Sequence, residues 1–135
     1  MVFCDVKHEE LTGKIIGVFY RVYNKLGYGF LEKVYENALA VEFRRLGLDF
    51  EQQAGVSVFY EGENVGDYVA DFIVEGCVVV EVKALVDWSG SEKGQLLNYL
   101  RATDLEVGLV LNFGKEAGVK RKILDNEFKG VGVGE

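Results

Sequence analysis

One apolar stretch of the chain carries charged residues at alternate positions. Glu81 and Lys83 alternate with Val80 and Val82 within the run from Val78 to Ala84. Successive side chains of a strand point to opposite faces, so Glu81 and Lys83 leave the same face. Unpaired charges rarely enter a protein core, and charges placed there usually have a function. The pattern therefore predicts a buried strand that carries part of a functional site.

Asp71 lies on the preceding predicted strand, which runs from Asp67 to Val74. If the turn between the strands spans Glu75 to Cys77, Asp71 falls directly opposite Glu81, with Cβ atoms roughly 4.5–5.5 Å apart. A strict two-residue turn would instead place the two carboxylates on opposite faces of the sheet. A shared acidic site therefore requires a three-residue or bulged turn.

Two carboxylates close together in an apolar sheet repel each other and resist ionisation. Mg²⁺ relieves this repulsion, because it prefers oxygen ligands and usually takes one or two carboxylates, with water and substrate phosphate completing its shell. Lys83 on the same face could orient a water or stabilise charge on a phosphate. Metal-assisted hydrolysis of a phosphodiester fits this set. The alternative is a solvated ion pair, because Asp-x(9)-Glu-x-Lys alone is a weak pattern.

Hydrophobic periodicity predicts the order helix, helix, three strands, helix, strand. This order favours an α/β fold in which a central mixed sheet is flanked by helices, with the third helix allowing a crossover to the fourth strand. The segment 120–128 is compatible with a short strand or a helix. The predicted helices cover about 8–25, 30–46 and 91–102, and the predicted strands cover about 56–60, 67–74, 78–84 and 106–112.

A length of 135 residues is that of one domain, expected over residues 1–129, with a flexible glycine-rich tail over 130–135. The net charge of −7 argues against nucleic-acid binding through a general basic field, although a local basic rim is compatible with it. No apolar run approaches the roughly 20 residues of a membrane span. Cys4 and Cys77 form no CxxC pair, and reduced thiols in the cytoplasm are the simplest interpretation.

The trio Asp71, Glu81 and Lys83 on a hairpin resembles the PD-(D/E)XK nuclease superfamily. More narrowly, the segment from Gly29 to Tyr35 resembles the signature of the GxxExxY protein family. The resemblance covers roughly residues 8–124 and implies a restriction-endonuclease-like core of order ααβββαβ. Further segments that fit the family are Leu26–Phe30, Ala70–Phe72, Glu81–Ala84, Gln95–Leu100 and Leu111–Gly114. Ala70 departs from the pattern, since the superfamily often has proline before the aspartate.

The resemblance also implies roles for further residues. In the RecB-like exonuclease type, a glutamate on the first core helix joins the metal ligands, and Glu32 matches it beside Asp71 and Glu81. A Gln-x-x-x-Tyr motif on the later helix is matched by Gln95 and Tyr99.

Gln95 and Tyr99 are spaced i, i+4, so they share a helix face and could reach the site together while Leu96 and Leu100 face elsewhere. For Tyr35 we prefer half-buried packing with a satisfied hydroxyl.

These observations favour a nuclease dependent on Mg²⁺ or Mn²⁺, with nucleic acid, expected to be DNA, as its partner. Asp71, Glu81, Lys83, Gln95 and Tyr99 are the predicted catalytic residues, and Glu32, Asp71 and Glu81 the predicted metal ligands. The alternative is a catalytically silent module that keeps the fold and acts in a homo-oligomer or with a partner protein. A small-molecule phosphohydrolase is a third and weaker option.

Overall fold

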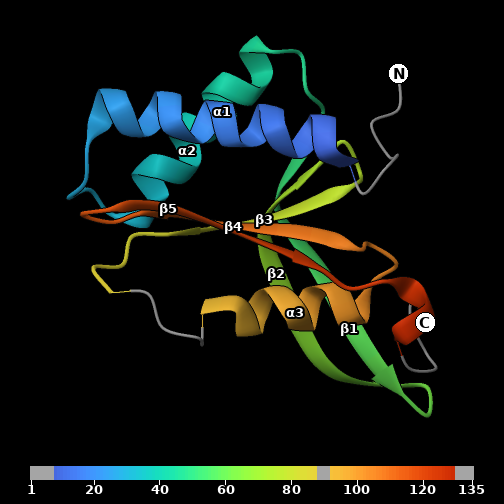
Figure 1. The fold of residues 1–135 in the computed structure, drawn as a ribbon. Coiled ribbons are helices and arrows are strands. Elements are labelled where there is room, and N and C mark those ends of the chain that lie inside the picture. Colours follow the sequence, from blue (N-terminus) through green and yellow to red (C-terminus); the bar gives the residue numbers. More distant parts are fainter. Residues whose placement is uncertain (1–7, 88–91, 130–135) are drawn as a thin grey trace.

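The computed structural model describes residues 8–87 and 92–129 (Figure 1). The tail predicted over 130–135 lies outside these residues. Within them, no helix is both long and apolar enough to cross a bilayer. The elements are α1 (Glu9–Leu26), α2 (Glu32–Arg45), β1 (Phe50–Tyr60), β2 (Glu63–Val74), β3 (Val78–Lys83), α3 (Glu92–Ala102), β4 (Val107–Phe113), β5 (Ala117–Ile123) and the short 3₁₀ helix η2 (Asn126–Phe128).

The five strands form one mixed sheet in the order β1-β2-β3-β4-β5. β3 and β4 are parallel, and the other three pairings are antiparallel. A parallel pair needs a crossover connection, which α3 supplies. In Figure 1, α1 and α2 lie on one side of the sheet and α3 on the other. The predicted α/β fold, with helices flanking a mixed sheet, is confirmed.

Three elements differ from the sequence prediction. β2 begins at Glu63, four residues before the predicted start at Asp67. β1 begins at Phe50, earlier than the alternating valines indicated, and the ambiguous segment over 120–128 contributes the end of β5 and then η2. Every residue of β4 is buried. Such a strand cannot stand at the edge of a sheet with its backbone donors and acceptors unpaired, and β5 pairs with it along all seven residues.

Each face of the sheet has its own apolar cluster. α1 and α2 contribute a regular stripe that packs on alternate residues of β3 and β4, as the periodicity predicts. α3 packs on the other face through Leu96, Tyr99 and Leu100, which meet Val79 and Val110. The sheet is therefore covered on both faces around β3 and β4, where the charged pair of the sequence lies.

Tyr35 links the two helices of the first cluster to the end of β4. Its ring is fully buried and stacks on Phe113, with ring centroids 4.3 Å apart. Its hydroxyl donates to the carbonyl of Gly27 over 2.6 Å. The predicted packing role with a satisfied hydroxyl is confirmed, with the ring fully rather than half-buried.

Cys77 corrects one expectation. Its side chain is buried, and it is disulfide-bonded rather than a reduced thiol. The expectation of reduced cysteines rested on the absence of a CxxC pair, and sequence spacing does not report which cysteines meet in the fold. The cytoplasmic setting stays a prediction.

Candidate active site

The turn between β2 and β3 sets the register of the acidic pair. Val74 pairs with Val78 and Phe72 pairs with Val80, so three residues connect the strands. Glu75 and Gly76 in this turn have φ of 54° and 64°, the left-handed conformation that tight turns use. Continued by one step, the register sets Asp71 opposite Glu81. The three-residue connection predicted from the sequence is confirmed.

At Asp71 and Glu81, side-chain carboxylates replace the backbone hydrogen bonds between β2 and β3. The regular ladder of β2 and β3 ends at Phe72 and Val80. Beyond it, the amide of Asp71 donates to Oε1 of Glu81 over 3.0 Å, and the amide of Val82 donates to Oδ2 of Asp71 over 2.7 Å. Each acid thus accepts a hydrogen bond from the opposite strand, and this exchange fixes both carboxylates between the strands.

The ladder is also interrupted on the other side of Asp71. β1 pairs with β2 at Gln52 and at Ala54, but Gln53, which faces Asp71, is missing from the register. Gln53 has φ of 56°, a left-handed conformation that is strained for a residue with a side chain. Its Nε2 donates to Oδ1 of Asp71 over 3.2 Å and to Oε2 of Glu36 over 2.9 Å. The strained residue therefore ties Asp71 to a second buried acid.

Glu36 is a buried charge on α2. Its carboxylate accepts hydrogen bonds from Gln52 Nε2 at 2.6 Å and Lys33 Nζ at 3.0 Å, in addition to Gln53. Burial alone would raise the pKa of Glu36, but the bonds from Gln52, Gln53 and Lys33 outweigh burial and lower the pKa. Glu36 is therefore held as an anion behind Asp71.

The pKa values of the two central acids are shifted the other way. Burial, followed by the negative charge of Asp71, raises the pKa of Glu81 to about 7, although the amide of Asp71 and the charge of Lys83 oppose the rise. Burial also raises the pKa of Asp71, and the charges of Glu36 and Glu32 add to the rise. Both pKa shifts have the same cause. Asp71 and Glu81 share a poorly solvated place in which their anionic forms repel each other, and a bound cation would stabilise those anionic forms.

Glu32 and Lys83 flank this pair. Glu32 is exposed at the first turn of α2, within electrostatic range of both Asp71 and Glu81. Lys83 is half-buried on β3, two residues beyond Glu81 and opposite Asn112 of β4. Among residues 8–87 and 92–129, no three Asp, Glu, His or Cys side chains are grouped closely enough to form a ready-made metal cage.

Gln95 and Tyr99 are placed differently from each other. Gln95 is exposed, and its Nε2 donates to the carbonyl of Val69, two residues before Asp71, over 3.2 Å. Tyr99 is buried in the α3 cluster together with Leu96 and Leu100, so the prediction that these leucines face away from Tyr99 is wrong. Burial, followed by the charges of Glu51 and Glu81, raises the pKa of Tyr99, which puts its hydroxyl in the electrostatic range of the site. Their joint action on a substrate stays a prediction.

The segment after Lys83 is held by β4. The fully buried side chain of Asn112 accepts from the amide of Leu85 over 2.7 Å and donates to the carbonyl of Leu85 over 2.9 Å. Gly114 allows this close approach, because a Cβ there would lie 1.8 Å from the carbonyl oxygen of Leu85. Together, Asn112 and Gly114 fix the direction in which the chain leaves the site.

Sequence reasoning missed Gln53, Glu36 and the role of Asn112. For Glu36 a signal existed, because it lies three and seven residues before Leu39 and Phe43, on the apolar stripe of α2. A charge on such a stripe needs a buried partner. For Gln53 the sequence offers no signal, since nothing marks a glutamine for a left-handed backbone.

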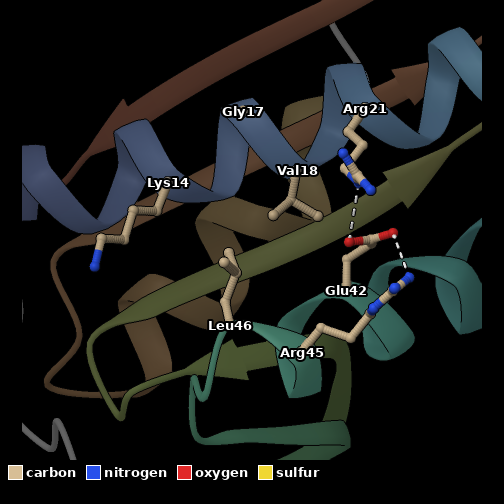
Figure 2. A pocket seen from close by; sticks show the side chains of 7 residues that line it. All are labelled: Lys14, Gly17, Val18, Arg21, Glu42, Arg45 and Leu46. Carbon is tan, nitrogen blue, oxygen red and sulfur yellow. Dashed lines mark ion pairs between the residues drawn. The ribbon is translucent and has the colours of Figure 1, made fainter.

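A hollow of about 460 Å³ lies elsewhere, between α1 and α2 (Figure 2). Arg21 Nε lies 3.2 Å from Oε1 of Glu42, and Arg45 Nη1 lies 3.8 Å from Oε2 of the same carboxylate. Both arginines are thus directed at Glu42. The hollow contains none of the acids described above, and we do not assign the site to it.

Comparisons with known proteins agree with the geometry. A family model described as the PD-(D/E)XK nuclease superfamily matches residues 9–122. The crystal structure of SSO0001 is similar to the chain with a TM-score of 0.56 at 17% identity, over 69% of this chain. The match spans half the length of SSO0001, and at this identity it supports the fold alone. No curated protein matches the sequence significantly.

Proposed function

Because the chain belongs to the PD-(D/E)XK nuclease superfamily, we propose that it hydrolyses phosphodiester bonds of nucleic acid, with DNA the expected substrate and Mg²⁺ or Mn²⁺ required. The observation that carries the proposal is the exchange of hydrogen bonds between Asp71 and the strand of Glu81, beside the ammonium of Lys83. We further propose a member of the GxxExxY type with RecB-like chemistry, on the motif from Gly29 to Tyr35 and the pair Gln95 and Tyr99.

The residues present fit a hard divalent cation. Asp71 and Glu81 are held by backbone donors and repel each other as anions, and carboxylate oxygens are the ligands that Mg²⁺ prefers. Glu32 would add negative charge next to them and could bind the ion through water. When bound, the ion would supply charge against a phosphate and lower the pKa of a coordinated water.

The remaining roles belong to the side chains around the acids. The ammonium of Lys83 would hold a phosphate oxygen or orient the attacking water, since Lys83 leaves the same face as Glu81. Gln53 and Glu36 would keep Asp71 in place. Gln95 and Tyr99 on α3 would position the nucleotide next to the scissile bond.

The first experiment tests Lys83 and Asp71 directly. Single- and double-stranded DNA and RNA are incubated with the protein and Mn²⁺ or Mg²⁺, and product formation is measured for wild type, Lys83→Met and Asp71→Asn. Loss of a group that stabilises charge in the transition state should lower the rate roughly 100- to 1,000-fold. The matched control is Lys14→Met, which removes an exposed lysine of α1 and should keep the wild-type rate.

Two outcomes would contradict the proposal. One is that Lys83→Met and Asp71→Asn cleave as fast as wild type. The other is that wild type cleaves none of the four nucleic acids with either metal, in which case a non-catalytic binding or assembly role takes its place. Circular dichroism of each variant ensures that a lost rate reflects chemistry rather than unfolding.

A further inference from the structure

The connection between α1 and α2 exposes apolar side chains next to the proposed active site. Tyr28 is 59% exposed, Phe30 49% and Leu31 82%. Single exposed apolar residues are ordinary on protein surfaces. Three among four consecutive residues, two of them aromatic, are a concentrated apolar feature, although Phe30 also packs edge to face on the buried ring of Tyr35, with centroids 6.0 Å apart.

These side chains are held out by a fixed backbone. The hydroxyl of Tyr35 donates to the carbonyl of Gly27 over 2.6 Å and accepts from the amide of Phe30 over 3.1 Å. Gly27 and Gly29 have φ of 67° and 115°, which residues with side chains rarely adopt. Because both ends of the loop are bonded to one buried phenol, Tyr28 and Phe30 cannot fold back into the core without breaking those bonds.

The loop between α1 and α2 lies close to the end of β3, the strand that carries Glu81 and Lys83. Tyr35, which anchors the loop, stacks on Phe113, and Phe113 directly follows Asn112, the residue paired with Lys83. In Figure 1 the connection from α1 to α2 lies at the same end of the molecule as the end of β3. Leu31 is followed by Glu32, which lies within electrostatic range of Asp71 and Glu81. The connection that carries the exposed rings therefore lies at the same end of the molecule as the acidic site (Figure 1).

We propose that Tyr28 and Phe30 form a stacking platform for unpaired nucleobases, and that single-stranded nucleic acid is the substrate class. The proposal rests on the proposed nuclease function. Bases within a duplex already stack on their neighbours, so an exposed aromatic ring gains most from bases of a single strand. Stacking also supplies binding that needs no positive charge, which suits a chain with a net charge of −7.

The test measures binding separately from cleavage. Fluorescence anisotropy follows a labelled 15-nucleotide oligo(dT), its duplex with oligo(dA) and an abasic strand of equal length, with Ca²⁺ replacing Mg²⁺. Wild type should bind the oligo(dT) strand at least about tenfold more tightly than either of the others. The variant Tyr28→Leu/Phe30→Leu keeps apolar bulk but removes the rings, and should weaken oligo(dT) binding roughly 5- to 100-fold while leaving abasic binding unchanged.

Two further variants sharpen this test. Tyr28→Leu alone replaces the more exposed ring and keeps the packing of Phe30 against Tyr35, so a loss of binding in this folded variant cannot be assigned to unfolding. Tyr60→Leu removes a ring that is 68% exposed at the far end of β1, and should bind like wild type.

The outcomes separate this inference from the nuclease proposal. Base-dependent binding without cleavage under Mn²⁺ would support the platform and contradict the nuclease. Cleavage with equal affinity for oligo(dT) and abasic strands would contradict the platform alone, and so would a wild type that binds no single strand. If the loop variants change only self-association, measured by light scattering, the patch is a protein interface and the platform is wrong.

Discussion

The two sides of β3 are built differently. Towards β4, all six residues from Val78 to Lys83 have partners in an unbroken parallel ladder. Towards β2, the ladder covers only Val78 to Val80, and then the side chains of Asp71 and Glu81 take over the hydrogen bonds. The backbone of β3 is therefore paired along its whole length with β4 and along only half its length with β2. We call these the intact side and the opened side of β3.

This difference shows how the fold can tolerate buried charge. Opening a ladder in a sheet leaves amides that must find acceptors, and here the acidic side chains supply them. The intact side, with Asn112 and Gly114 holding Leu85, keeps the end of β3 in place while the other side is open. Stability is concentrated on the β4 side and the proposed chemistry on the β2 side, and the two can be broken separately.

The largest effect is expected from Gly114→Ala, which breaks the intact side. The added Cβ would lie 1.8 Å from the carbonyl oxygen of Leu85, and backbone cannot give way as a flexible side chain can. We expect a loss of about 3 kcal/mol or more in the free energy of unfolding, measured by urea denaturation. Catalytic activity should also fall, because the segment that follows Lys83 must move.

The control variant for this prediction is expected to raise the free energy of unfolding rather than lower it. Gly13 lies within α1, where an added Cβ meets nothing within 4 Å, so Gly13→Ala should stabilise the protein by about 1 kcal/mol through helix propensity. An unchanged stability for Gly114→Ala would contradict the anchoring role of the β4 side.

The next largest effect is expected in the pH dependence of the free energy of unfolding, which tests the opened side of β3. The pKa of Glu81 in the folded protein is about 7, against an ordinary value of 4.5. Between these values the folded state binds more protons than the unfolded state, so stability should fall as pH rises from about 4.5 to 7. The contribution of Glu81 is on the order of 3 kcal/mol at most, and the raised pKa of Asp71 acts in the same direction.

Glu81→Gln removes this titration. The variant should be more stable than wild type at pH 8 and should show a flatter dependence of unfolding free energy on pH. Millimolar Mg²⁺ should stabilise wild type at pH 8 and have little effect on the variant. The matched control Glu63→Gln replaces an exposed carboxylate of β2 and should follow the wild-type curve. Equal slopes for Glu81→Gln and wild type would show that the acid is not held as described.

The intact side and the opened side also differ in how far the sequence predicts them. Alternation in β3 predicted the shared face of Glu81 and Lys83, whereas the sequence set Asp71 opposite Glu81 only on condition of a three-residue or bulged turn. The structure fulfils that condition, with three residues between Val74 and Val78. The intervening helix allowed a crossover and favoured a mixed sheet, and the structure shows that β3 and β4 are its parallel pair. These features are local in sequence or fixed by a rule of connection.

What the sequence did not reveal depends on contacts between distant segments. Glu36 meets Gln52 and Gln53 across sixteen and seventeen residues, and Asn112 meets Leu85 across twenty-seven. The strand β5 was ambiguous for another reason: its basic residues suit a half-exposed strand and a short helix equally.

The smallest effect is expected at Gln53, where the ladder between β1 and β2 is interrupted beside Asp71. Two substitutions at Gln53 separate the cost of backbone strain from the loss of hydrogen bonds. Gln53→Ala and Gln53→Gly both remove the bonds to Asp71 and Glu36, but only glycine accepts φ of 56° without steric cost. Gln53→Gly should therefore be more stable than Gln53→Ala by about 1 kcal/mol, measured by thermal denaturation. Equal stability would mean that the left-handed backbone at Gln53 is not maintained, and that β1 can pair with β2 without a break. The opening at Asp71 would then be confined to the side of β3.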